Sequence, residues 1–178
     1  LETQERLILV ESGKVTPVLR AEKLVVSALA WHQGKVLAAT APDGRIVAVG
    51  AADAGEPFAD PAAKYIWSML SDDKRLLVAT GEPGSVLELD AAGRSKVLFT
   101  PDETHMRVLA RHPQRGVLAG GGSKGIVYQL RPNGGAFALY DSGMDEVTAL
   151  AVDAKTGDVY AALVSETKAG VVLADKTI

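Results

Sequence analysis

The chain has 178 residues, of which 47% are hydrophobic, enough for a folded core and too many for a disordered chain. Its net charge of −3 argues against the basic surface that nonspecific nucleic-acid binding requires. The longest apolar stretch is far shorter than the roughly 18 residues of a spanning helix. We therefore expect neither a nucleic-acid partner nor membrane insertion. The absence of cysteine excludes disulfides, thiolate-bound metals and thiol nucleophiles.

Short strands separated by turn residues fill the chain, and no segment sustains the apolar period of a helix. We expect less than about 5% helix. The chain begins with a pair of predicted strands at residues 7–11 and 15–20. Three sets of four follow, at residues 25–31, 35–40, 45–49 and 56–60; at 65–71, 75–80, 85–90 and 96–100; and at 105–111, 116–121, 126–131 and 136–140. Three last strands are predicted at residues 147–152, 158–164 and 170–175.

The sets of strands repeat with a period of about 40 residues, so that residues 35–40 align with 75–80 and Gly44 aligns with Gly84. A period of about 40 to 45 residues built from short strands is typical of a β-propeller blade of four antiparallel strands. An apolar residue recurs at one place on the first, innermost strand of each set, and we expect it to be buried. These residues are Leu29, Met69, Leu109 and Leu150.

Several of these segments resemble known propeller blades. Residues 27–31, followed by 34–40 and 43–47, resemble a degenerate WD40-type blade, although both the Gly-His and the Trp-Asp dipeptides are missing. Residues 147–153 and 156–162 resemble the blades of NHL-like bacterial propellers. The resemblance covers about residues 6–175. It implies a bacterial β-propeller that binds partners on its top face, formed by the loops that enter the innermost strands.

The repeats predict one all-β domain spanning residues 1–178. It comprises a half blade at 6–20, blades at 25–60, 65–100 and 105–140, and a three-stranded partial blade at 147–175. Because a propeller must close to cover its sheet edges, this set of blades favours an incomplete ring or a ring completed by an oligomer. We expect self-association or the remainder of a longer chain, and we regard a closed four-bladed ring as the less favoured alternative.

Two sequence patterns resemble reactive or ligand-binding sites without their required context. Residues 120–125 match the dinucleotide fingerprint, but a strand follows them where that fingerprint needs a helix. We interpret the run as a tight strand end. His32 and His112 follow innermost strands, whereas His105 precedes one, so the three histidines do not converge on a metal. We expect surface or turn positions for all three histidines, and no cofactor.

The top face is the most informative candidate site. Its repeat-equivalent positions hold Val25, Tyr65, His105 and Glu146, and two residues further on Ser27, Trp67, Arg107 and Thr148. Packing usually keeps one residue class at repeated positions, so this variation indicates positions that packing does not control. Residues two apart on a strand project to the same side. We therefore predict that Tyr65, Trp67, His105 and Arg107 form one patch, and we add Glu146 as a candidate ligand- or partner-binding residue.

This patch favours a noncatalytic recognition scaffold that binds a protein segment or small ligand on its top face. The alternative implied by the resemblance is a metal-dependent enzyme of the lactonase or lyase type, with metal ligands on the innermost strands. Glu146 and His105 lie near that place, and no convincing third ligand accompanies them. The cysteine-free composition favours a periplasmic or extracellular protein over a cytoplasmic one without fixing the compartment.

Overall fold

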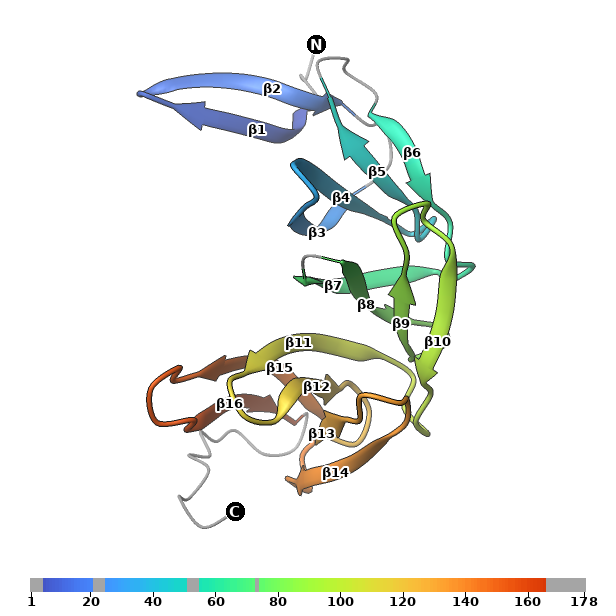
Figure 1. Cartoon of the computed structure of the whole chain (residues 1–178), viewed down its shortest axis with the longest axis vertical. Coiled ribbons are helices and arrows are strands. Elements are labelled where there is room, and N and C mark those ends of the chain that lie inside the picture. Colours follow the sequence, from blue (N-terminus) through green and yellow to red (C-terminus); the bar gives the residue numbers. More distant parts are fainter. Residues whose placement is uncertain (1–4, 21–24, 51–54, 73, 166–178) are drawn as a thin grey trace.

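The computed structural model describes residues 5–20, 25–50, 55–72 and 74–165. Every regular element in these ranges is a β-strand, in agreement with the predicted all-β fold. The strands form five antiparallel sheets, which follow one another along an open arc (Figure 1). Accordingly, the described part of the chain contains no helix of the length and apolar character needed to cross a membrane.

Three of the sheets are complete four-stranded blades, each with its strands paired in chain order. The first blade comprises β3 (Val25–His32), β4 (Lys35–Ala41), β5 (Ile46–Val49) and β6 (Glu56–Ala59). The second comprises β7 (Tyr65–Asp72), β8 (Arg75–Gly81), β9 (Val86–Leu89) and β10 (Ser95–Phe99). The third comprises β11 (Met106–His112), β12 (Gly116–Gly121), β13 (Ile126–Leu130) and β14 (Ala136–Asp141).

A two-stranded sheet lies at each end of the arc (Figure 1). One pairs β1 (Glu5–Glu11) with β2 (Lys14–Arg20), and the other pairs β15 (Glu146–Val152) with β16 (Val159–Val164). The two sheets lie apart in Figure 1, so the described residues do not form a closed four-bladed ring. The strand predicted at 170–175 lies outside the described residues.

Apolar cores fill the spaces between neighbouring blades. The alternation of side chains along β8 contributes to two of these cores, because Leu76 and Val78 pack toward the first blade while Leu77 and Ala79 pack toward the third. Such two-sided burial explains why the central strand β8 is an almost uninterrupted apolar run.

The burial predicted for the repeated apolar position is confirmed in the two middle blades, where Met69 is 9% exposed and Leu109 is 8% exposed. It is wrong for Leu29, which is 49% exposed, and Leu150 is only partly buried. This position faces the preceding blade. The β1–β2 hairpin, which precedes β3, projects away from it (Figure 1), and no four-stranded blade covers this side of the first blade. Leu29 therefore stays exposed.

Every innermost strand contains an irregularity at the same repeat position. The pairing of each innermost strand with its neighbour shifts register there, so one residue lacks a direct partner, as in a β-bulge. The residues at these four bulges are Ser27, Trp67, Arg107 and Thr148. The innermost strands begin at one end of the blades, which we call the top face, and they end at the opposite end, the bottom face. The bulges lie near the top face.

At the bottom face, two histidines connect neighbouring sheets. His32 and His112 end β3 and β11 beside the turns, but they are 2% and 3% exposed, so a surface position is wrong for both. His32 Nδ1 is 2.8 Å from Ser71 Oγ in the second blade, and His112 Nε2 donates a hydrogen bond of 2.9 Å to the carbonyl of Gly157 beyond the third blade. Both rings are buried because each reaches across the interface to the next sheet.

Candidate functional site

The top-face candidates come from the starts of three neighbouring innermost strands. Tyr65 begins β7, His105 immediately precedes β11, and Glu146 begins β15. Trp67 and Arg107 occupy the bulges of β7 and β11, where the extra residue changes the direction of its side chain. The structure brings all five predicted residues into one chain of contacts, which we call the top-face cluster. All five side chains are half-buried.

Aromatic contacts form one half of the cluster. The rings of Tyr65 and Trp67 stack with centroids 5.0 Å apart and an interplanar angle of 18°. Trp67 Nε1 donates a hydrogen bond of 3.1 Å to Nδ1 of His105. Because Nδ1 accepts this bond, the neutral imidazole carries its proton on Nε2. None of the described residues accepts a hydrogen bond from that Nε2.

The guanidinium of Arg107, which two neighbouring side chains fix in place, forms the other half of the top-face cluster. The Cζ atom of Arg107 lies 4.0 Å from the ring centroid of Trp67, and Arg107 Nε donates a hydrogen bond of 2.8 Å to Glu146 Oε1. The side chains of Arg107 and Glu146 remain 29% and 25% exposed. Within the described ranges, the terminal nitrogens Nη1 and Nη2 have no partner. The Arg107 guanidinium is therefore held at Nε by Glu146 and on one face by Trp67. Its Nη1 and Nη2 atoms can donate hydrogen bonds to a ligand.

Two glycines allow the cluster to form, and neither is among the predicted site residues. A Cβ atom at Gly81, the last residue of β8, would lie 2.1 Å from His105 Nδ1 and 2.4 Å from Trp67 Nε1. A Cβ atom at Gly122 would lie 2.6 Å from Arg107 Cγ. The sequence could have indicated them through their positions at strand ends of the second and third blades.

The glycine-rich run at residues 120–125 binds a carboxylate of the chain itself. Glu103, only 7% exposed, accepts hydrogen bonds at Oε2 from Ser123 N (2.8 Å), Ser123 Oγ (3.0 Å) and Lys124 N (3.0 Å). Its Oε1 accepts a hydrogen bond of 3.1 Å from the hydroxyl of Tyr128. Desolvation, and then the charge of Glu103, raises the pKa of the Tyr128 phenol well above its ordinary value. The run is thus a structural turn, as its strand context predicts.

The geometry of the cluster separates the two residues considered as metal ligands. Arg107 pairs with Glu146, and Trp67 occupies Nδ1 of His105. Among the described residues, no group of three or more histidine, aspartate or glutamate side chains is placed to hold a metal ion. The arrangement is suited to stacking on a flat group and to donating hydrogen bonds to an oxygen acceptor.

Comparison with known proteins identifies the fold. No family model matches the chain, and no curated protein matches it significantly. Among solved structures, a chain of a nidogen/laminin complex is similar with a TM-score of 0.67 at 13% identity, over 88% of this chain and 65% of that one. The computationally designed Ika4 protein is similar with a TM-score of 0.54 at 19% identity, over 84% of this chain and 99% of that one.

The designed Ika8 protein gives a TM-score of 0.52 at 20% identity, with 84% of this chain matching 49% of that one. This chain therefore spans less than two thirds of the matched nidogen/laminin chain and about half of Ika8. At these identities the likeness concerns the fold alone. Together with the four-stranded antiparallel sheets, it shows that the chain forms an open arc of β-propeller blades.

Proposed function

We propose that the protein is a noncatalytic recognition scaffold that binds a protein segment on its top face. The observation that carries this proposal is the Arg107 guanidinium, held flat against Trp67 and fixed through Nε by Glu146, with both terminal nitrogens unpaired among the described residues. A guanidinium held in this way is preorganised to donate two parallel hydrogen bonds to a carboxylate. Preorganisation reduces the ordering cost of binding.

The remaining members of the cluster fit a peptide as ligand. Tyr65 and Trp67 provide rigid aromatic surface for an apolar or flat side chain, and His105 Nε2–H provides a donor for a main-chain carbonyl. Tyrosine, tryptophan and arginine are also the residue types that most often contribute binding energy at protein interfaces. The similarity to a chain of a nidogen/laminin complex supports this assignment at the level of fold, because that neighbour belongs to a protein complex.

A selected peptide tests the proposal. A random peptide library is panned against the protein, and the dissociation constant of the best peptide is measured for the wild type and for Arg107→Lys and Trp67→Ala. We expect each variant to weaken binding at least about tenfold, the effect of losing roughly 1.4 kcal/mol. The matched control is Trp31→Ala, because Trp31 is the other tryptophan and is 67% exposed on the first blade, outside the cluster.

Trp31→Phe provides a second readout by leaving Trp67 as the single tryptophan. Peptide binding to this variant is expected to change the tryptophan fluorescence, with a midpoint that matches the dissociation constant. The proposal is wrong if Trp31→Ala weakens binding as much as Trp67→Ala does. It is also wrong if the selected peptides bind Arg107→Lys with the affinity of the wild type.

A further inference from the structure

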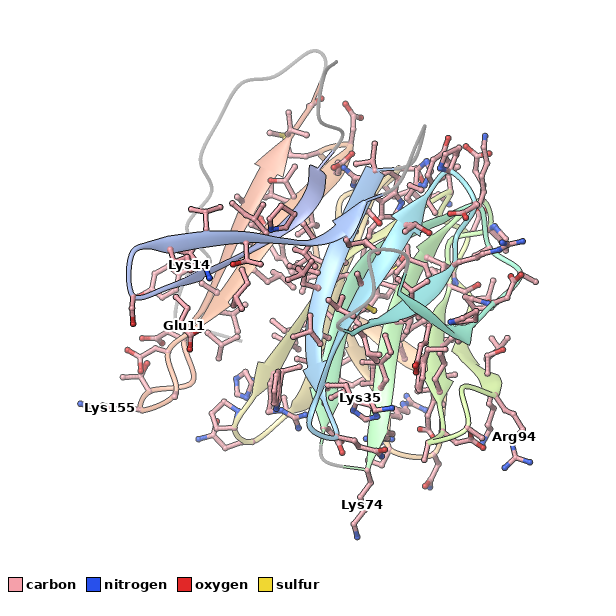
Figure 2. All side chains as sticks on the ribbon, turned by 90° about the horizontal axis from the view of Figure 1, so that it is seen from above. Glu11, Lys14, Lys35, Lys74, Arg94 and Lys155 are labelled. Atoms are coloured by element: carbon pink, nitrogen blue, oxygen red, sulfur yellow. The ribbon has the colours of Figure 1, made fainter. Side chains whose placement is uncertain are left out.

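A pocket of about 480 Å³ opens at the bottom face between the second and third blades. The turns that follow the innermost strands form this face. Lys35, which begins β4, and Lys74, in the turn before β8, lie at the same end of the molecule in Figure 2. Among the described residues, four charged side chains line the pocket, and all four are arginines. They are Arg75, Arg111, Arg115 and Arg131, and we call the site the arginine pocket.

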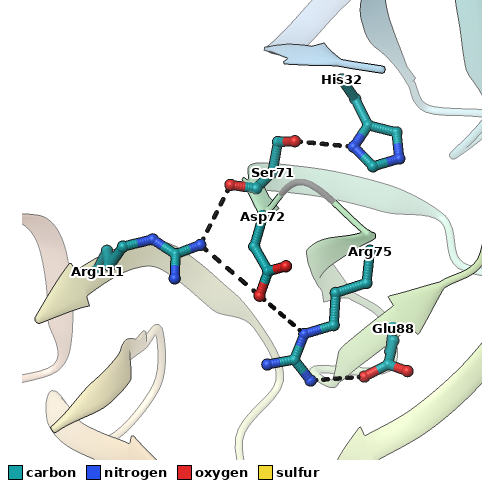
Figure 3. Close-up of polar contacts among 6 residues, drawn as sticks. All are labelled: His32, Ser71, Asp72, Arg75, Glu88 and Arg111. Atoms are coloured by element: carbon teal, nitrogen blue, oxygen red, sulfur yellow. Dashed lines mark hydrogen bonds and ion pairs between the residues drawn. The ribbon is translucent and has the colours of Figure 1, made fainter.

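One wall of the arginine pocket is fixed by a network of ion pairs (Figure 3). Arg75 Nε lies 3.0 Å from Asp72 Oδ2, and Arg75 Nη1 lies 2.9 Å from Glu88 Oε2. Arg111 reaches the same wall through Nη2, which donates a hydrogen bond of 3.3 Å to the carbonyl of Ser71 and lies 3.9 Å from Asp72. The two carboxylates therefore serve mainly Arg75, which acts as a wall residue.

Two other arginines retain donors for a ligand. Arg111 is half exposed, and its Nε and Nη1 atoms have no partner in the described ranges. Arg131 directly follows β13, is exposed, and has its Cζ atom 5.8 Å from the ring centroid of Phe137. In the part of the chain that the structure describes, no carboxylate pairs with Arg131. The pocket thus combines positive charge with unused donors.

The pocket also has an apolar floor. Gln129 borders it and is fixed in place, because its Nε2 donates a hydrogen bond of 3.0 Å to the carbonyl of Arg115. Leu77, Val117 and Leu130 of the core between the blades lie at the floor. The volume is within the range of pockets that bind ligands.

We propose that the arginine pocket binds an acidic peptide segment, with its carboxylates on Arg111 and Arg131. An apolar side chain of the segment covers the floor formed by Leu77, Val117 and Leu130. A peptide matches both the unused donors and the apolar floor, whereas a phosphate or a small dicarboxylate supplies only the negative charge. The site lies at the opposite end of the blades from the top-face cluster, so it is independent of the function proposed above.

The test uses a labelled peptide of alternating glutamate and leucine, acetylated and amidated at its ends, and measures binding by fluorescence anisotropy. A peptide with glutamine in place of glutamate is the uncharged comparison. We expect the glutamate peptide to bind at least about tenfold more tightly, and Arg111→Gln or Arg131→Gln each to weaken its binding about tenfold. Arg45→Gln is the matched control, because Arg45 is an exposed arginine that does not line this pocket.

Three results overturn the proposal. The first is equal binding of the two peptides, or no binding of either at millimolar concentration. The second is an effect of Arg45→Gln as large as that of the pocket variants, which indicates nonspecific charge attraction. The third is displacement of the peptide by glutarate or inorganic phosphate at concentrations near the dissociation constant of the peptide, which indicates a site for a free anion. Circular dichroism of each variant confirms that it is folded.

Discussion

Replacing Glu103 tests whether the glycine-rich loop of the third blade is held by the chain's own carboxylate. Glu103→Ala removes an acceptor of four hydrogen bonds, three at Oε2 and one at Oε1. Hydrogen bonds to charged groups contribute about 1.5 to 3 kcal/mol each when buried. Because Ser123 and Lys124 are exposed and their amides can be hydrated, we take about 1 kcal/mol per bond and expect a loss of about 3 to 5 kcal/mol.

Glu103→Gln removes the negative charge of the side chain and keeps its size, so it separates the two effects. Its amide oxygen can accept the three donors of the loop, and the Tyr128 hydroxyl can turn to accept from its amide nitrogen, so we expect a smaller loss of about 1 to 2 kcal/mol. Urea denaturation gives both values. Asp102→Ala is the control, since Asp102 is 97% exposed and, within the described residues, pairs with Lys124 alone, so no measurable change is expected. A loss below about 1 kcal/mol for Glu103→Ala, or equal losses for both Glu103 variants, refutes the reasoning.

Other predictions concern packing, the cluster and pH. Leu109→Ala removes a buried leucine and should lower the free energy of unfolding, measured in urea, by about 2 to 5 kcal/mol. Leu29→Ala, on an uncovered face, should lower it by less than about 0.5 kcal/mol. Similar losses for the two variants contradict the difference in burial. Gly81→Ala should displace Trp67 and shift the tryptophan emission, and an unchanged spectrum contradicts the close contact. The raised pKa of Tyr128 means that its protonated form stabilises the fold fully below about pH 10 and that this contribution is lost as the pH rises through the folded-state pKa. Tyr128→Phe should therefore remove the last-titrating part of the tyrosinate absorbance, and an unchanged titration is evidence against the shift.

The sequence predicts the features that recur in every repeat. It does not predict features found in one blade alone, or whether a neighbouring blade covers a given side chain. The period of about 40 residues places Trp67 and Arg107 at equivalent positions, and their contact follows. The period does not reveal that a bulge, rather than simple alternation, aims these side chains. It also predicts burial for Leu29, which fails because burial requires a preceding blade. Glu103 was missed since its donors come from a turn that no other repeat shares.

The bulges explain why recognition residues can occupy the middle blades at low structural cost. In the first blade and in the β15–β16 sheet the same bulge holds small hydroxyl residues. Ser27 Oγ donates to the carbonyl of Ala39 at 3.3 Å, and Thr148 Oγ1 donates to the carbonyl of Ala162 at 3.2 Å. The irregular backbone therefore belongs to the fold, and it accepts either a hydroxyl that bonds locally or the large side chain of Trp67.

This equivalence gives a last prediction, namely that Trp67→Ser keeps the fold and loses recognition. The variant forfeits one aromatic pair, one cation–π contact and the hydrogen bond to His105, roughly 1.5 to 4 kcal/mol together. A serine hydrogen bond like that of Ser27 offsets about 0.5 to 1.5 kcal/mol of this loss. The net cost of about 1 to 2.5 kcal/mol lies below the roughly 3 to 5 kcal/mol of removing a core tryptophan. A urea-denaturation loss in that larger range, or undiminished binding of a selected peptide, would show that Trp67 is held there for packing and not for a partner.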